Sequence, residues 1–240
     1  MEILAVEGLP EIVVGDDLAA LIAAAVELRD GDVVCVAQKV VSKAEGRVVR
    51  LADVEPSDEA RELAGPDGDA RRLEVVLRES ARIVRSRPPL VIAETRHGFV
   101  CAAAGVDASN APAPETVVLL PEDPDASAER LRTALEERSG RSLGVIVTDT
   151  FGRSWRLGIT NVAIGASGVE VLRDLRGVHD PTGYELHSTV IAIADEIASA
   201  AELVMGKTSR IPAAVVRGIA ASGSGTASDL VMPPEHDLFR

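Results

Sequence analysis

The chain has 240 residues, of which 46% are hydrophobic and only 2% aromatic, and its formal net charge is −13 at pH 7. This length and apolar content are typical of a folded α/β or α+β protein and exclude a disordered chain. The acidity argues against nucleic-acid binding, which needs a basic surface. No apolar run reaches the roughly eighteen residues of a membrane span, and no signal peptide is recognisable, so we expect a cytoplasmic protein without membrane contact.

The first third of the chain predicts helices around one buried strand. Asp16 or Asp17 can cap a helix, because the apolar residues that follow have helical spacing. Residues 30–37 (DGDVVCVA) combine a turn with a continuous apolar run, which is typical of a buried strand. Two further helices are expected over 57–64, before a Gly-Pro stop, and over 69–84.

Short strands and loops are expected from residue 88 onward, followed by a second set of regular elements. These are a helix over 127–138 that ends before Gly140, a buried strand over 143–148, a helix with apolar residues from Val190 to Val204, and a strand over 212–218. The tail from Ser222 is expected to be loose. Cys35 and Cys101 lie in apolar runs, which predicts buried thiols and argues against a disulfide framework or a structural zinc site.

Residues 148–153 (TDTFGR) are the first candidate for a functional site. Asp149 and Thr150 follow the predicted strand over 143–148 directly, so we expect them at its carboxyl end, facing a crevice. A carboxylate beside a hydroxyl suits Mg²⁺, which prefers oxygen ligands, and Arg153 and Arg156 could hold anionic oxygens. The alternative is an ordinary polar turn at the end of a strand.

Two other segments could complete such a site. Asp107 and Asn110 follow another apolar run, and Asp107 is a second candidate metal ligand if its strand end lies beside that of Asp149; an Asx turn is the alternative. Lys39 and Lys43 gather positive charge straight after a buried strand, where they could contact phosphates, although a solvated basic turn has the same composition. Residues 205–209 (MGKTS) are not a P-loop, because the glycine and the strand that should precede them are missing.

Taken together, these motifs resemble the coenzyme F420-0:γ-glutamyl ligase family. The matching segments are GLPEI (8–12), GDDL (15–18), DGDVV (30–34), VVSKAEGR (40–47), RHGFVCAAAGVDASN (96–110), TDTFGRSWRLGITNVAIG (148–165), ADEIASAAELVMGK (194–207) and VVRG (215–218). The resemblance extends to the N-terminal part of a bifunctional actinobacterial ligase. It implies that GTP phosphorylates a carboxylate of coenzyme F420-0, that L-glutamate attacks the acyl phosphate, and that further glutamates are added through γ-linkages.

The resemblance also implies a fold, a set of ligands and roles for particular residues. Residues 1–240 would form one ligase domain, a two-lobed α+β fold that makes an intertwined homodimer with the site near the interface. The ions would be Mg²⁺ or Mn²⁺, with K⁺ as a further candidate. The metal ligands would be Asp107, Asp149 and Thr150; the GTP site would be lined by Leu9, Pro10, Glu11, Ile12, Gln38, Lys39, Lys43, Asn110 and Lys207; Asp149 and Arg153 are the candidate catalytic residues.

Two positions depart from the family pattern. Lys207 stands where a glutamine ligates the metal in archaeal members, and Gln38 replaces a small hydroxyl residue. A lysine ammonium has no lone pair to offer a cation. Two other functions stay open: a related amide ligase that uses an acyl phosphate on another acid, and a non-catalytic lobe that binds a nucleotide or cofactor. The pairing of Asp107 with Asp149 and Thr150 favours an enzyme.

Overall fold

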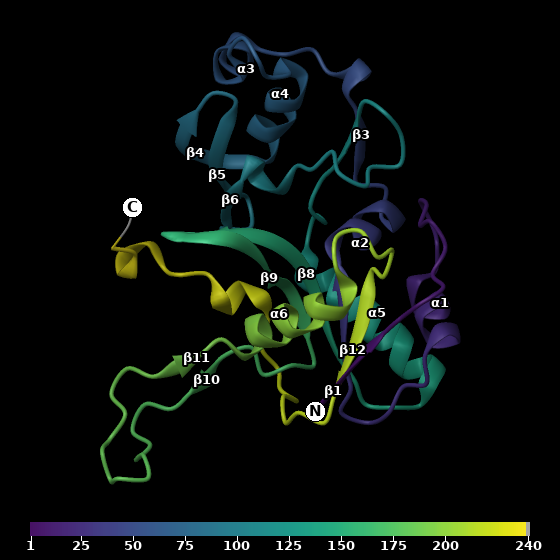
Figure 1. Ribbon diagram of the computed structural model, residues 1–240, viewed down its shortest axis with the longest axis vertical. Coiled ribbons are helices and arrows are strands. Elements are labelled where there is room, and N and C mark those ends of the chain that lie inside the picture. Colours follow the sequence, from purple (N-terminus) through teal and green to yellow (C-terminus); the bar gives the residue numbers. More distant parts are fainter. Residues whose placement is uncertain (239–240) are drawn as a thin grey trace.

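A mixed five-stranded sheet forms the centre of the molecule (Figure 1), in a computed structural model that describes residues 1–238. The strands, in their order across the sheet, are β1 (Glu2–Ala5), β12 (Ala213–Arg217), β2 (Val33–Ala37), β8 (Gly144–Arg153) and β9 (Arg156–Ser167). Only β2 and β8 run parallel to each other; every other neighbouring pair is antiparallel. The expected buried strands over 30–37, 143–148 and 212–218 are therefore confirmed, whereas β1 and β9 were not anticipated.

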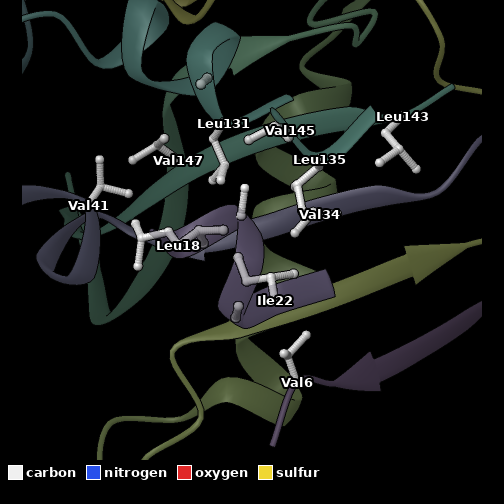
Figure 2. Packing of buried hydrophobic residues seen from close by; sticks show 14 of the residues in the cluster. Val6, Leu18, Ile22, Val34, Val41, Leu131, Leu135, Leu143, Val145 and Val147 are labelled. Atoms are coloured by element: carbon white, nitrogen blue, oxygen red, sulfur yellow. The ribbon is translucent and has the colours of Figure 1, made fainter. Parts of the chain in front are cut away.

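Helices cover both faces of this sheet, because its central strands are apolar on both sides. Helices α1 (Leu18–Ala25) and α5 (Pro124–Ser139) pack on one face, and α6 (Ile193–Met205) packs on the other. Side chains along β2 alternate accordingly, with Val34 in the first core and Cys35 in the second. Figure 2 shows the first core, where Leu135 from α5 is fully buried and contributes about 2 kcal/mol through the apolar area removed from water.

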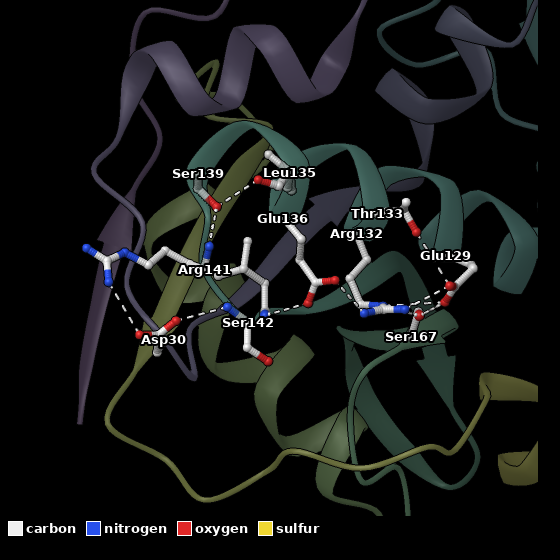
Figure 3. A network of polar contacts seen from close by, with 11 residues as sticks. Asp30, Glu129, Arg132, Thr133, Leu135, Glu136, Ser139, Arg141, Ser142 and Ser167 are labelled. Carbon is white, nitrogen blue, oxygen red and sulfur yellow. Dashed lines mark hydrogen bonds and ion pairs between the residues drawn. The ribbon is translucent and has the colours of Figure 1, made fainter.

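A polar network ties the end of α5 to the start of β8 (Figure 3). Arg132 donates to Glu136, and Glu136 accepts from the backbone N–H of Leu143 at 2.9 Å. Arg132 also donates to Ser167 at the end of β9. The helix itself begins at Pro124, three residues earlier than expected, because Asp123 accepts from the N–H of Ala126 and caps it. The hydrogen bonds of Arg132 and Glu136 hold the end of α5 against Leu143, the residue before β8.

Residues 48–119 leave the sheet and form a second core, which we call the small lobe; the other described residues are the large lobe. The chain enters this lobe through β3 (Val48–Arg50) and returns through β7 (Thr116–Val118), and these two strands pair with each other. Between them lie α3 (Asp58–Ala64), α4 (Ala70–Glu79), β4 (Ser80–Arg87), β5 (Leu90–Thr95) and β6 (Val100–Ala102). The small lobe stands at the top of Figure 1, and the fold as a whole is α+β.

Several predicted element boundaries are confirmed and one is clearly wrong. Asp17 caps α1, Ser57 caps α3 before Gly65, and Gly140 ends α5 in a left-handed conformation. The helix expected over 69–84 instead ends at Glu79, and the residues that follow form β4. Pairing with β5 outweighs helical periodicity here, since β4 and β5 form an antiparallel ladder from Ser80 to Arg87 that is interrupted by only two register shifts.

Three other segments differ from expectation. The polar residues after β2 form helix α2 (Gln38–Ala44) instead of a loop. Val190 belongs to the short strand β11 (Val190–Ile191), which pairs with β10 (Arg173–Asp174) at the base of a polar arm, so α6 begins later than expected. The tail from Ser222 includes two 3-10 turns, one of which buries Ala227 against the large lobe. No helix in residues 1–238 combines the length and the apolar character that a bilayer crossing requires.

Candidate active site

A cavity of about 820 Å³ opens where β2 ends beside β8. Its lining comes from residues 9–12, 37–40, 43, 110–112, 148–150, 161, 202, 205–208 and 210–212. The volume lies in the range that small-molecule sites occupy. All the site residues expected from the sequence line this cavity except Asp107, Arg153 and Arg156.

Unequal strand lengths create the cavity. The parallel pairing of β2 with β8 stops at Ala37, opposite Thr148, but β8 continues to Arg153 as one arm of a hairpin with β9. The expectation that Asp149 follows the end of its own strand is therefore wrong. The crevice exists because the neighbouring strand stops, which leaves one edge of β8 without a strand partner from Asp149 onward. A bulge in β9 lies at the same level, between the pairs that involve Val147 and Thr148.

Asp149 is a largely buried carboxylate with little to stabilise its charge. Burial raises its pKa from 3.8 to about 6, against the opposing influence of the Thr150 backbone N–H, Lys39 and Lys207. Asp107 lies close enough for its charge to raise that pKa further. A buried carboxylate that gains so few donors favours a nearby cation.

Thr150 belongs to a hydrogen-bonded chain that the sequence did not reveal. Its hydroxyl donates to Oδ1 of Asn161 at 2.8 Å, and Nδ2 of Asn161 donates to Oε2 of Glu202 at 2.9 Å. Asn161 is buried on β9 and Glu202 lies on α6, so these two hydrogen bonds join the edge of β8 to α6. Neither residue was predicted, because their contacts cross strands and helices that lie far apart in sequence.

Asp107 reaches the edge of the cavity through the two strands that connect the lobes. Its backbone pairs with Val118 of β7 by two hydrogen bonds of 2.8 and 3.0 Å, and β7 pairs with β3, which follows α2 closely in the chain. Lys39 of α2 then donates to Oδ2 of Asp107 at 2.6 Å. Burial raises the pKa of Asp107, but the hydrogen bonds from Lys39 and Ser109 outweigh burial and hold that pKa below its ordinary value. Ser109 N–H also donates to the carboxylate, so the predicted Asx turn is present alongside the ion pair.

Helix α2 supplies the positive side of the cavity. Lys43 is only 6% exposed and bonds Glu11, and Gln38 is only 1% exposed, so the alternative of a solvated basic turn is wrong. Oε1 of Gln38 accepts from Ser42, whereas its Nε2 has no partner within residues 1–238. A buried donor without an acceptor is costly, so this amide is available to bond an acceptor that enters the cavity.

The distribution of lysine supports the same conclusion. The sequence contains three lysines, Lys39, Lys43 and Lys207, and all three line this cavity. Arginine carries the rest of the positive side-chain charge. Because an ammonium is a compact point charge that serves as a phosphate contact, the cavity is suited to an anionic ligand.

Arg153 and Arg156, which were expected at the site, lie outside the cavity. Arg153 stands near the tip of the β8–β9 hairpin, where its Nη2 donates to the Leu157 carbonyl oxygen at 2.6 Å. His97 bonds the carbonyl oxygen of Glu122 outside the cavity. Asp195 of α6 is partly buried; it accepts from the N–H of Ala163, and burial raises its pKa. Burial also raises the pKa of the Cys35 thiol to about 12, so this cysteine stays protonated.

The donor set fits a hard cation that keeps part of its water or phosphate shell. Asp149 has unused lone pairs, Thr150 offers hydroxyl and carbonyl oxygens, and Asp107 fits once Lys39 releases it. Within residues 1–238 no group of three or more His, Cys, Asp or Glu side chains is placed to hold a metal ion. Further ligands of such an ion would have to be other oxygens, because the ammonium of Lys207 has no lone pair to offer.

Partly buried carboxylates beside a cluster of lysines are typical of an enzyme that acts on phosphorylated ligands. Comparison with known proteins names the family. The family described as "F420-0:Gamma-glutamyl ligase" matches residues 8–218, so this chain belongs to that family of ligases. Its similarity to individual members covers nearly the whole chain.

Proteins named coenzyme F420:L-glutamate ligase from three archaea illustrate this similarity. The chain is 51% identical to that of Methanopyrus kandleri over 233 residues, which covers 94% of this chain and 92% of the relative. It is 45% identical to that of Archaeoglobus fulgidus over 242 residues, covering 100% and 96%. It is 41% identical to that of Methanothermobacter thermautotrophicus over 250 residues, covering 100% and 99%.

Proposed function

We propose that this protein is a GTP-dependent ligase that couples L-glutamate to coenzyme F420-0. The observation that carries the proposal is the single cavity that gathers three lysines, the orphan amide of Gln38 and the buried carboxylate of Asp149. A carboxylate of F420-0 attacks the γ-phosphorus of GTP, so a P–O bond forms and GDP leaves. The amine of glutamate then attacks the acyl carbon, so a C–N bond forms and phosphate leaves with the electron pair of the broken C–O bond.

The residues of the cavity have complementary roles in this scheme. Lys39 and Lys43 neutralise phosphate oxygens, and the Nε2 of Gln38 donates to one of them. Residues 9–12 and Asn110 line the rest of the nucleotide site. Such fixed charges stabilise the transition state of phosphoryl transfer by position alone, without a covalent protein nucleophile.

A divalent ion, Mg²⁺ or Mn²⁺, is part of the proposal. Asp149, Thr150 and Asp107 would hold it, and it would supply neutralising charge to the phosphate oxygens. The low pKa of Asp107 keeps that carboxylate ionised, and Lys39 is placed to move from Asp107 to a phosphate. K⁺ remains a candidate for stimulating the reaction, to be tested by varying the potassium concentration.

Mass spectrometry tests the activity directly. Purified protein is incubated with F420-0, L-glutamate, GTP and Mg²⁺ or Mn²⁺, and products heavier by one or more glutamates are expected. A ladder of products would support γ-linked extension, and replacing GTP with ATP measures the preference for guanine. If no mass shift follows with any metal, the chain is either a ligase for another acid or a non-catalytic binding lobe. GDP binding without turnover would favour the second.

We also propose a cytoplasmic homodimer. The β8–β9 hairpin exposes Trp155, Leu157 and Ile159 by 80%, 97% and 59%, and exposed apolar side chains grouped in this way are typical of interaction surfaces. Sedimentation analysis of the wild type and of Leu157→Asp tests this, with a monomeric variant as the expected result. Arg153 lies on the same hairpin but outside the cavity of its own chain, so a catalytic role for it requires that the hairpin reach the cavity of the partner subunit in the proposed dimer. Arg153→Ala tests that role.

A further inference from the structure

Glu202 is a carboxylate of the cavity that the nucleotide and metal assignments do not use. It lies on α6, partly buried, and faces the same cavity as Lys39 and Asp149. Its Oε2 accepts from the buried Asn161, and Asn161 is itself held by Thr150. This chain of hydrogen bonds fixes the carboxylate in place before any ligand binds.

The charge of Glu202 is not neutralised by the protein. No lysine, arginine or histidine forms an ion pair with it anywhere in residues 1–238, although partly buried carboxylates such as Glu79 and Glu136 each pair with an arginine. Asn161 donates to only one of the two carboxylate oxygens of Glu202. A carboxylate that is held rigidly in a cavity without a cationic partner is suited to a cationic ligand group.

Two cations lie on the loop that follows the same helix. Lys207 and Arg210 line the cavity, and neither forms an ion pair within the described chain. Lys207 is near Asp149, whose pKa it lowers, whereas Arg210 has no such assignment. An arginine can bind a carboxylate through two parallel hydrogen bonds. Glu202 and Arg210 therefore offer one negative and one positive group to a ligand in the same cavity.

We propose that Glu202 and Arg210 form the subsite for the amino-acid substrate, with Glu202 binding its α-ammonium and Arg210 one of its carboxylates. This inference rests on the proposed ligase function and extends it to the second substrate. Glu202 holds this nitrogen in the cavity that Asp149 also lines, and the ammonium gives one proton to solvent before its nitrogen attacks the acyl carbon. Asn161 is a positioning residue that orients Glu202.

Glu202→Gln is the decisive variant, because it keeps the shape and removes the charge. Initial rates are measured with L-glutamate varied at saturating GTP, and then with GTP varied. The KM for L-glutamate is expected to rise about ten- to hundred-fold, which corresponds to losing one charge-assisted hydrogen bond, while the KM for GTP stays unchanged. The matched control is Glu196→Gln, which removes a charge from the exposed side of the same helix and should leave both values unchanged.

Hydroxylamine provides a readout that a merely structural role would not produce. As an uncharged nucleophile at pH 8 it can attack the acyl phosphate without an ammonium site, forming a hydroxamate and releasing phosphate. Glu202→Gln should make hydroxamate at the wild-type rate while its use of low L-glutamate concentrations falls. Arg210→Met should likewise raise the KM for L-glutamate and spare that for GTP.

Other results would overturn the subsite. An unchanged KM for L-glutamate in Glu202→Gln removes Glu202 from it, and a weaker affinity for Mn²⁺ in the presence of GDP would assign Glu202 to the metal instead. A lost response to K⁺ with an unchanged KM for L-glutamate would assign it to a monovalent ion. If the wild-type protein adds no glutamate to F420-0, the proposed function itself fails, and that failure is seen before any variant is made.

Discussion

The two lobes each place one aspartate at the cavity, and the pKa values of these two carboxylates are shifted in opposite directions. Asp149 of the large lobe lies on a central strand whose buried surroundings offer few donors, and its pKa is raised to about 6. Asp107 of the small lobe is held by Lys39 and Ser109, and its pKa is lowered. The difference teaches that the sheet provides the desolvated reaction centre, whereas the small lobe delivers an ionised group that is already paired.

The largest expected effect is the loss of activity when Asp149 becomes asparagine. If the desolvated carboxylate is the reaction centre, Asp149→Asn should lower kcat at least about a hundred-fold, as the removal of one transition-state electrostatic contact does elsewhere. Glutamate addition to F420-0 is measured by mass spectrometry, and circular dichroism checks the fold. Turnover within a few-fold of wild type would mean that Asp149 is not part of the reaction centre, and that the difference between the two carboxylates has no role in activity.

Stability should respond most strongly in the large lobe. Asp32 is fully buried and accepts two hydrogen bonds of 2.8 Å from Arg217, which join β2 to β12. Arg217→Met leaves this charge unpaired and should lower the free energy of unfolding by about 3 kcal/mol. Urea denaturation measures the loss, and the double variant Asp32→Asn with Arg217→Met should recover much of it.

A pair in the small lobe supplies the control for that comparison. Arg50 and Asp53 form an ion pair whose side chains are 75% and 59% exposed. Arg50→Met should therefore change the free energy of unfolding by no more than about 0.5 kcal/mol. Equal losses from the two pairs would mean that the lobes do not differ in the way their charges are buried.

The pH dependence of stability should separate the two carboxylates by sign. Folding raises the pKa of Asp149, so without metal its destabilising charge develops as pH rises through about 4 to 6, and Asp149→Asn should gain about 2 kcal/mol relative to wild type over that range. Folding lowers the pKa of Asp107, so its stabilising contribution is present above pH 4 and lost as pH falls. Urea denaturation in EDTA from pH 3 to pH 8 measures both; a wild type that gains stability relative to Asp149→Asn as pH rises would contradict the first.

A more modest change in activity is expected from the contact that joins the lobes. Lys39→Met removes both the ion pair with Asp107 and one phosphate contact, so we expect the KM for GTP to rise about ten-fold, in line with one charged hydrogen bond. Hydrogen exchange should also increase at residues 107–112 without nucleotide. If exchange there is unchanged, the small lobe holds Asp107 through β7 alone.

The sequence predicted which residue types form the site better than it predicted how the strands form the cavity around them. Asp149, Thr150 and the lysines were predictable, because their residue types follow apolar runs that form strands. That the crevice arises from β2 stopping before β8 was not predictable, since relative strand length depends on pairing between distant segments. Glu202 was missed for the same reason: its partner Asn161 lies 41 residues away on another element.

Propensity also failed where tertiary pairing decided the outcome. Residues 80–84 continue a helical pattern, yet they form β4 because β5 is available as a partner. Conversely, QKVVSKA has no marked amphipathic pattern and still forms α2, which starts directly after β2 and turns Gln38 and Lys43 inward. The division into two cores was indicated only by the change from helical patterns to short strands and loops near residue 88, which lies well inside the small lobe.

The confinement of lysine to the cavity has a practical consequence. Apart from the chain's own terminal amine, every primary amine of this protein belongs to its candidate active site. Amine-directed acylation of side chains would therefore fall on this cavity alone, at rates limited by the burial of Lys43 and the ion pair of Lys39, while the arginine-rich exterior stays unchanged. The extent of labelling thus doubles as a measure of how much of the site a bound nucleotide covers.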